Sequence, residues 1–257
     1  MIKKAREFLF KSNKDDKLLP PMKLRDHVGD GDFEALGNYF LDHFKTIGNL
    51  KPHESVLDVG CGSGRMALPL MNYLSDRARY EGFDVDKNCI QWCQDNITPR
   101  KRNFNFKHVD IFNTFYNPNG KIIPDYFVFP YESDTFDFIY LTSIFTHMLP
   151  KDMDHYFSEI SRVLKKGGRS FITYFIINQE SLNCIQQDKS IIKFVDTGKG
   201  YYSPFTDIPE KVLAYDESYI RTLYSKYGLT INEPVYHAKW SGREEGIQGQ
   251  DVILAIK

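Results

Sequence analysis

At 257 residues the chain is long enough for one large domain, and with 42% hydrophobic and 15% aromatic residues it can bury a substantial core. Its 33 basic and 34 acidic side chains nearly cancel to a net charge of −1, which argues against a basic surface for nucleic-acid binding. The apolar run near the N-terminus is shorter than a signal-peptide core or a membrane span. We therefore expect a cytoplasmic protein with no membrane partner.

The first 35 residues precede the repeating part of the sequence, and we expect them to form a helical extension. Their beginning is basic and briefly apolar, which is typical of a short amphipathic helix. The rest of the chain, residues 36–257, is predicted to be one α/β domain.

From about Ser55 onward, short apolar runs alternate with helix-like segments, a pattern typical of a parallel α/β sheet. The predicted strands are Ser55–Val59, Tyr80–Asp84, Asn105–Val109, Phe136–Leu141 and Arg169–Phe175. The predicted helices between them are Arg65–Leu74, Lys87–Asn96 and Asp152–Leu164. Lysines and then paired glycines at residues 165–168 are typical of a helix end and a turn into the last of these strands.

The end of the chain follows a different pattern. A helix is predicted over Glu217–Tyr227, with Gly228 as its C-terminal cap. Two further strands, Leu229–Tyr236 and Asp251–Ile256, have no helix between them and should pair antiparallel. Together with the five parallel strands they complete a seven-stranded sheet.

Two long segments do not fit the repeating unit. Residues 111–135 form an aromatic-rich crossing, and residues 176–215 lie between the fifth strand and the last helix. Loops of this length inside a compact domain are often functional or mobile. We therefore predict a cap insertion at about residues 176–215 that covers a substrate.

The four cysteines show no Cys/His pairs at zinc-ligand spacing, so we expect reduced thiols and no metal site. Reduced thiols are typical of a cytoplasmic protein. These residues are Cys61, Cys89, Cys93 and Cys184.

A glycine-rich loop joins the first strand to the first helix. Gly60, Gly62 and Gly64 permit a tight turn and a close approach of ligand to backbone, but dinucleotide-binding folds use the same device. The dinucleotide fingerprint would need its third glycine at Arg65. Asp58 would repel a pyrophosphate but attract the ammonium of a methionine moiety. The loop therefore favours a sulfonium methyl donor over a dinucleotide.

Acids also end the second and third predicted strands. Asp84 is placed to accept hydrogen bonds from both ribose hydroxyls, although a dinucleotide's ribose would be held in the same way. Asp110 is placed to accept a hydrogen bond from the adenine amine, with Ile111 packing on the ring. The alternative is that Asp110 caps a turn.

In combination these residues resemble the class I S-adenosylmethionine-dependent methyltransferase superfamily, in its small-molecule, methyltransferase-domain branch. The resemblance covers about residues 50–175 and, more loosely, the terminal strand pair. It implies a Rossmann-like α/β fold whose seven-stranded sheet has the order 3-2-1-4-5-7-6, strand 7 antiparallel, flanked by helices. Further matching segments are Phe129–Asp137, Leu141–Met148 and Ile160–Gly168.

The resemblance implies S-adenosyl-L-methionine as the cofactor and assigns residues to each part of it. Residues around the methionine part are Asp58, Gly60, Cys61, Gly62 and Gly64, with the backbone of Leu141 and Thr142 near its amino group. Asp84 and Val85 are expected at the ribose, and Asp110 and Ile111 at the adenine.

The acceptor end is less clearly marked. His147 follows the fourth strand and titrates near neutrality, so it is the leading general-base candidate; the alternative is a packing histidine bonded to backbone. Trp240 and Arg243, with Gln250-Asp251 after them, combine a stacking surface with charge and are candidate substrate residues. Tyr174 is another. The alternative for Trp240 is an ordinary core or anchoring role. The alternative for Tyr174 is a place in a tyrosine-rich surface loop.

We therefore predict an enzyme that methylates a small-molecule acceptor, with O-methylation of a sugar or natural product ahead of N-methylation. Leu141-Thr142-Ser143-Ile144 stands where DNA base-amine methyltransferases carry an Asp-Pro-Pro-Tyr-type motif, which argues against a nucleic-acid substrate. The alternatives are a nicotinamide-dependent reductase and a cofactor-binding scaffold without turnover. Both a monomer and a homodimer remain open.

Overall fold

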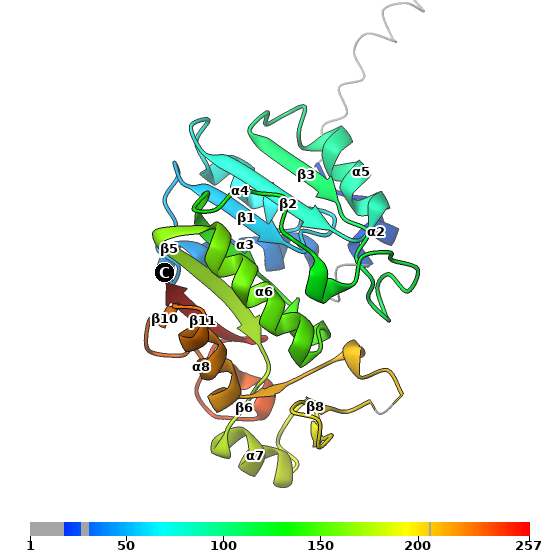
Figure 1. The fold of residues 1–257 in the computed structure, drawn as a ribbon, viewed down its shortest axis with the longest axis vertical. Helices are drawn as coiled ribbons and strands as arrows, with labels where there is room; N and C mark the ends of the chain where they lie inside the picture. Colours follow the sequence, from blue (N-terminus) through cyan, green and yellow to red (C-terminus); the bar gives the residue numbers. More distant parts are fainter. Residues whose placement is uncertain (1–17, 27–30, 206) are drawn as a thin grey trace, which may run out of the picture.

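The computed structural model describes residues 18–26, 31–205 and 207–257. The amphipathic helix expected at the start of the N-terminal extension lies outside these residues. Within them the chain forms one central sheet with helices on both faces and a smaller unit at one end (Figure 1). No helix among these residues has the length and apolar character that a bilayer crossing requires.

The main sheet has seven strands in the order β10-β11-β5-β4-β1-β2-β3 within the described part of the chain. Strands β1 to β5 run parallel to one another, and β11 runs antiparallel to both β5 and β10. This confirms the predicted order, with β10 and β11 as the sixth and seventh strands. Their bounds are β1 Ser55–Val59, β2 Arg79–Asp84, β3 Phe104–His108, β4 Phe136–Leu141, β5 Leu164–Tyr174, β10 Thr230–Ile231 and β11 Asp251–Ile256.

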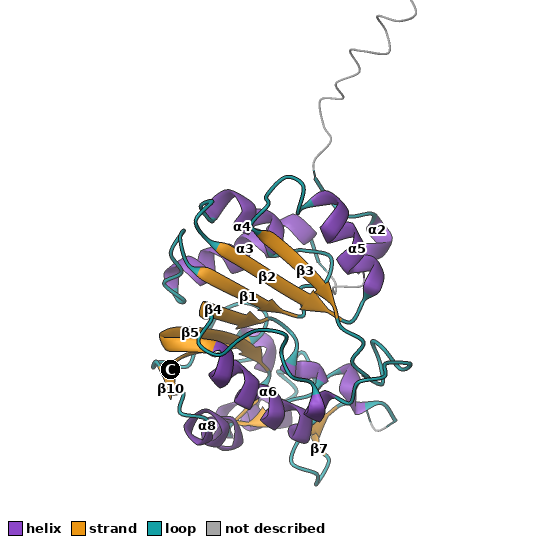
Figure 2. Cartoon of the chain, turned by 45° about the horizontal axis from the view of Figure 1, so that its top comes forward, coloured by secondary structure: helices purple, strands orange, loops and turns teal. Residues whose placement is uncertain are grey.

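Alternating side chains of the central strands supply two apolar cores, one on each face of the sheet. One core packs against the layer of α3, α4 and α5 and the other against α6 and α8; Figure 2 shows the two layers. In β1, for example, Val56 belongs to the first core and Leu57 to the second. The bounds are α3 Phe33–Thr46, α4 Ala67–Tyr73, α5 Lys87–Asn96, α6 Pro150–Val163 and α8 Glu217–Lys226.

The N-terminal boundary at residue 36 falls inside α3 rather than before it. The helix starts at its cap Asp32, whose side chain accepts the backbone N–H of Ala35 at 2.7 Å. Further along, Phe44 is fully buried against Tyr140 of β4 and Phe171 of β5. Helix α3 is therefore part of the sheet's helical layer. A short helix, α2 (Met22–Asp26), precedes it.

Two predicted boundaries differ from the structure for local reasons. The expected turn at residues 165–168 is the irregular start of β5, where Gly167 takes a φ of +77° and the pairing with β4 shifts register. The strand predicted over Leu229–Tyr236 is reduced to Thr230–Ile231. Pro234 lies inside the predicted span, and a proline supplies no N–H for strand pairing.

The predicted cap at residues 176–215 forms short elements around a third apolar core. Trp240 and Phe194 belong to this core, so the cap packs against the segment that leads into β11. The elements are β6 Ile176–Ile177, α7 Gln179–Gln186, β7 Val195–Asp196, β8 Tyr202–Ser203, the 3-10 turn η3 Pro209–Lys211 and β9 Tyr215–Asp216. The described residues also form the 3-10 turns η1 Pro124–Tyr126, η2 Phe145–His147 and η4 Lys239–Ser241.

Candidate active site

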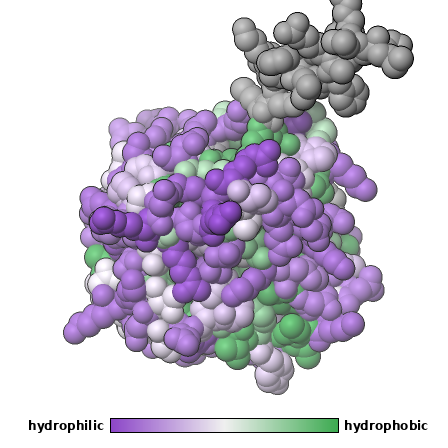
Figure 3. Space-filling view, turned by 90° about the horizontal axis from the view of Figure 1, so that it is seen from above, coloured by the Kyte–Doolittle hydropathy of each residue, from purple (hydrophilic) through white to green (hydrophobic). Residues whose placement is uncertain are grey.

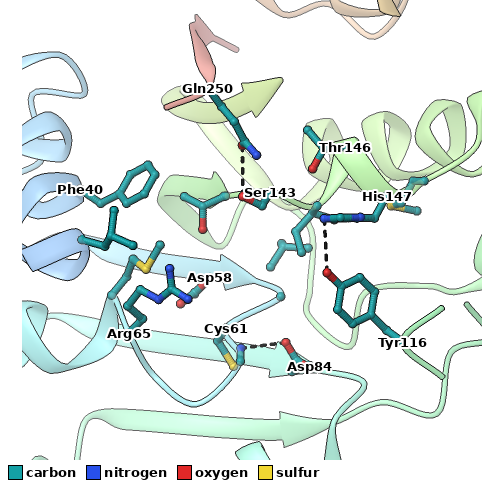
Figure 4. A pocket seen from close by; sticks show the side chains of 18 of the residues that line it. Phe40, Asp58, Cys61, Arg65, Asp84, Tyr116, Ser143, Thr146, His147 and Gln250 are labelled. Carbon is teal, nitrogen blue, oxygen red and sulfur yellow. Dashed lines mark hydrogen bonds between the residues drawn. The ribbon is translucent and has the colours of Figure 1, made fainter. Parts of the chain in front are cut away.

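A cavity of about 1010 Å³ opens at the carboxyl ends of β1, β2 and β4 (Figure 4). Its volume is at the upper end of the range for small-molecule sites, roughly 300–1,000 Å³. Side chains of α3, the crossing at residues 111–135 and the cap complete its walls. Several hydrophobic side chains of the crossing are exposed beside the cavity. Figure 3 shows hydrophobic patches on a face of the molecule that is otherwise hydrophilic.

The loop after β1 is held against the end of β2. The N–H groups of Gly60 and Cys61 both donate to the carbonyl of Phe83, at 2.9 and 3.1 Å. Gly60 has a φ of +80°, and a Cβ there would overlap Cδ1 of Ile144, so both backbone conformation and space require glycine. Gly64 does not line the cavity; a Cβ there would lie 2.8 Å from Cδ1 of Ile97, so this glycine allows packing against helix α5.

Asp58 lies buried in the floor of the cavity. Its Oδ2 accepts the hydroxyls of Tyr80 and Tyr140, at 2.6 and 2.7 Å. Burial raises the pKa of Asp58 to about 7, although both tyrosine hydrogen bonds oppose the shift. A carboxyl so placed is poised to ionise when a cation binds beside it.

Asp84 joins the end of β2 to the glycine loop. Its Oδ2 accepts the N–H of Gly62 at 2.7 Å, and its Oδ1 accepts the N–H of Asp86 at 2.8 Å. Burial raises the pKa of Asp84, and these backbone hydrogen bonds oppose the shift. Val85 follows it in the wall of the cavity.

The predicted adenine end is mainly apolar. Ile111 lines the cavity together with Val109 and Phe83, as expected for a wall that packs on a flat ring. Asp110 is placed outside this lining: its Oδ1 accepts from Nδ2 of Asn117 at 3.2 Å. Its main-chain carbonyl also binds the crossing, so Asp110 holds that loop rather than facing the cavity.

Beyond β4 the chain turns sharply into the cavity. Leu141 is fully buried in the sheet, whereas Thr142 reaches the lining. Ser143 takes a φ of +60°, a strained conformation for a residue with a Cβ. Such strain is common at functional sites. Nothing in the sequence pattern marked Ser143 for this conformation.

His147 lies in the cavity wall with both ring nitrogens engaged (Figure 4). Nδ1 is 2.9 Å from the carbonyl of Glu210, which can only accept, so Nδ1 carries the proton. Nε2 then holds a lone pair and accepts from the hydroxyl of Tyr116 at 3.3 Å. Burial lowers the pKa of His147, which keeps the ring neutral near pH 7.

The three predicted substrate residues do not line the cavity. Tyr174 is fully buried and its hydroxyl meets that of Tyr224 at 3.0 Å. Trp240 donates its indole N–H to the buried Asp251 at 2.7 Å. Arg243 is buried beside Ser241. These side chains support the cap and the start of β11.

Other cavity residues had no distinctive sequence signal. Thr146 is 1% exposed, and its hydroxyl has no hydrogen-bond partner among the described residues. Asp152 and Tyr156 enter the wall from helix α6, and Gln250 enters it from the loop that directly precedes β11. Tyr39 of α3 closes another side, donating its hydroxyl to the carbonyl of Gln248 at 2.9 Å. Within the described ranges, no cluster of three or more His, Cys, Asp or Glu side chains could hold a metal ion.

Residues 56–168 match a family described as "Methyltransferase domain". The chain is similar to that family over these residues, which make up less than half of its length. The match covers the strands and loops that build the floor of the cavity, from Val56 in β1 to Gly168 in β5.

A curated relative is also a methyltransferase by name. Over 151 residues the chain is 26% identical to the sterol 24-C-methyltransferase erg6 of Schizosaccharomyces pombe, a match that covers 59% of this chain and 35% of that protein. The matched segment thus spans about a third of that relative.

Solved structures show the same fold at low identity. The PH0226 protein of Pyrococcus horikoshii OT3 is 16% identical with a TM-score of 0.58, over 91% of this chain and 94% of that one. The magnesium protoporphyrin IX methyltransferase of Synechocystis PCC 6803, solved with bound SAH, is 14% identical with a TM-score of 0.56 over the whole of both chains.

Proposed function

We propose that this protein transfers the methyl group of S-adenosylmethionine to a hydroxyl group of a small-molecule acceptor. The observation that carries the proposal is that one cavity joins the cofactor loop of β1 to the lone pair of His147 Nε2. A cofactor-binding floor and a neutral base therefore face the same space.

The residues on the floor suit the methyl donor. The buried carboxyl of Asp58 would ionise to pair with the donor's ammonium, and its Oδ1 is free of the two tyrosine hydrogen bonds made to Oδ2. Glycine at position 60 lets a ligand approach the backbone closely. Asp84 and Val85 would face the ribose, and Ile111 the adenine. The bound donor supplies an electrophilic methyl group on a positively charged sulfur.

His147 would act on the acceptor. Because Nδ1–H is tied to the carbonyl of Glu210, the ring holds Nε2 in a fixed direction. An acceptor hydroxyl that replaces the hydroxyl of Tyr116 at Nε2 would give its proton to His147 as its oxygen takes the methyl group and the donor's sulfur leaves as a neutral thioether. The cavity walls then serve to align the reactants and exclude water.

The lining bears on the kind of acceptor. The cavity walls beyond His147 are mainly apolar, and Trp240, the candidate for stacking on a sugar, lies outside the cavity lining. We therefore favour a hydroxyl-bearing natural product with an apolar ring face over an unsubstituted sugar. The apolar wall residues include Phe112, Met148, Phe175, Ile192 and Val212.

N-methylation is the second candidate, and Asp152 is the observation in its favour. This carboxylate lines the cavity, and burial together with neighbouring Asp125 raises its pKa to about 6. The adjacent Lys151 pairs with Asp125 instead. At pH 7 Asp152 is thus an ionised group that would attract a protonated amine.

The test has two stages. Calorimetry with S-adenosylhomocysteine must show binding that Asp58→Asn weakens, since the ammonium loses its counter-charge. Tritiated methyl transfer to paired hydroxyl and amine panels then identifies the acceptor atom. Absence of S-adenosylhomocysteine binding by wild-type protein would overturn the proposal, and labelling confined to amines would replace O-methylation by N-methylation.

A further inference from the structure

The side-chain amide of Gln250 is held in one orientation at the wall of the cavity. Its Oε1 accepts the hydroxyl of Thr173 at 2.6 Å and the hydroxyl of Ser143 at 3.1 Å. The Thr173 hydroxyl in turn accepts the backbone N–H of Ser143 at 2.8 Å, which directs its own hydrogen toward Gln250. The amide oxygen is therefore fully engaged on the protein side.

This arrangement leaves the two N–H groups of Gln250 Nε2 for the cavity. Gln250 belongs to the lining, and among the described residues Nε2 makes no hydrogen bond. Figure 4 shows Gln250 reaching down to Ser143, across the cavity from Asp84. An amide that is fixed at its oxygen and open at its nitrogen is a preorganised hydrogen-bond donor.

The strained backbone of Ser143 is a second sign that this network has a purpose. Ser143 holds a φ of +60° while its N–H and hydroxyl both join the network. It lies between Thr142, at the predicted methionine end of the cofactor, and His147, the proposed base. The network is thus anchored where cofactor and acceptor meet.

We propose that Gln250 binds an oxygen atom of the acceptor through Nε2. The acceptor therefore carries a hydrogen-bond-accepting oxygen in addition to the hydroxyl that is methylated. This inference rests on the proposed function. The groups that surround the amide, Ser143 and Thr173, are uncharged, so the matching oxygen is a neutral ether, hydroxyl or carbonyl rather than a carboxylate.

The experiment uses matched probes on the full chain saturated with S-adenosylhomocysteine. Guaiacol carries an ether oxygen beside its hydroxyl, and 2-ethylphenol has the same shape with a methylene in place of that oxygen. Their dissociation constants are measured by ligand-observed NMR titration. We expect guaiacol to bind about threefold to tenfold tighter, the worth of one neutral hydrogen bond.

Variants assign the preference to the amide. Gln250→Leu should abolish it, and Gln250→Glu should abolish or reverse it, because a carboxylate presents acceptors only. Thr173→Val, which frees the amide to rotate, should reduce it. Gln179→Leu on the exposed start of α7 should leave it unchanged. In each variant the affinity for S-adenosylhomocysteine should stay within about twofold of wild type.

Equal binding of the two probes by wild-type protein, or no binding of either, would overturn the inference. So would a tenfold loss of S-adenosylhomocysteine affinity in Gln250→Leu, because that result would place Nε2 on the cofactor. If wild-type protein binds S-adenosylhomocysteine normally and lacks the probe preference, only the role of Gln250 fails. If it does not bind S-adenosylhomocysteine, the proposed function itself fails.

Discussion

The carboxylate of Asp84 accepts the backbone N–H of Gly62 at 2.7 Å, which makes the acid that ends β2 and the loop that follows β1 one hydrogen-bonded unit. The second oxygen of Asp84 accepts the N–H of Asp86 at the start of helix α5. A single side chain thus sets the shape of the loop and faces the proposed ribose position. A change at Asp84 should affect both.

We expect Asp84→Asn to weaken S-adenosylhomocysteine binding by about tenfold or more. In the variant, the amide NH₂ would face one of the two backbone N–H groups that Asp84 now binds, so that hydrogen bond is lost. The remaining hydrogen bonds would lose their charge, and charged hydrogen bonds are worth roughly 1.5–3 kcal/mol each. Isothermal titration calorimetry measures the loss. Asp95→Asn, on an exposed position of α5, is the matched control. Equal affinities for wild type and Asp84→Asn would remove Asp84 from the cofactor site.

Asp58 should make cofactor binding depend on pH. Its pKa of about 7 in the free protein means that the carboxyl is mostly protonated at pH 5.5 and mostly ionised at pH 7.5. An ammonium binds the ionised form, so S-adenosylhomocysteine affinity should rise by about tenfold or more across this interval, with proton release on binding. Calorimetry in buffers of different ionisation enthalpy measures both quantities.

Two variants test this assignment. Asp58→Asn should bind more weakly and with little pH dependence. Tyr140→Phe removes one hydrogen bond that stabilises the carboxylate, so it should raise the pKa and move the midpoint of the rise to higher pH. A pH dependence that is unchanged in Asp58→Asn would mean that another group controls it.

His147 should control turnover without affecting cofactor affinity. His147→Asn is expected to lower kcat by about 10²–10⁴, the usual contribution of a general base. Because burial lowers its pKa below the ordinary value of 6.5, the acid limb of the wild-type rate profile should lie below pH 6.5 and disappear in the variant. Initial rates with an acceptor from the methyl-transfer panel measure this effect.

Tyr116→Phe is the control for His147, since it removes the hydroxyl at Nε2 but keeps the imidazole. It should retain most of kcat. If His147→Asn instead lowers the melting temperature while kcat persists, the histidine serves packing alone.

The framework of the fold could be read from the sequence because buried parallel strands appear as short, continuous apolar runs. Ser55–Val59, Phe136–Leu141 and Asp251–Ile256 match the observed strands. The cap could not be resolved in the same way. Strands of two residues, such as Val195–Asp196, carry no periodicity, and Pro234 shortened a strand whose composition looked regular.

The residues of the candidate site also differ in whether local sequence or long-range packing sets their positions. Asp58, Gly60 and Asp84 follow local rules, because a strand end and a tight turn set their positions. Trp240 and Tyr174 lie outside the cavity lining, and this could not be predicted because their partners, Asp251 and Tyr224, are brought to them only by packing across the chain. No residue pattern marked the left-handed backbone of Ser143 or its link to Gln250, which is 107 positions away.

Gly60→Ala should destabilise the fold more than Gly228→Ala. Both glycines have positive φ, at +80° and +69°, so each substitution incurs the left-handed penalty of roughly 1–2 kcal/mol. A Cβ at Gly228 meets nothing within 4 Å, whereas one at Gly60 overlaps Ile144. Urea unfolding should therefore separate the two variants, and adding Ile144→Ala to Gly60→Ala should restore part of the difference. Equal losses would mean that the loop moves to accommodate the methyl group.

Trp240 should matter for stability and not for ligands. Trp240→Phe removes the indole N–H that Asp251 accepts at 2.7 Å, while the same buried carboxylate still binds the N–H groups of Ile176 and Ala238. Loss of one charged hydrogen bond in the core should lower the free energy of unfolding by roughly 1.5–3 kcal/mol in urea titrations.

The second tryptophan provides the comparison for this prediction. Trp92 lies half-buried on α5, so Trp92→Phe should lower stability less. Neither change should alter S-adenosylhomocysteine affinity or the guaiacol preference by more than about twofold. The opposite result, normal stability with loss of the guaiacol preference in Trp240→Phe, would mean that Trp240 influences acceptor binding. Because Trp240 does not line the cavity, the effect would pass through its partner Asp251 to Gln250, which directly precedes β11.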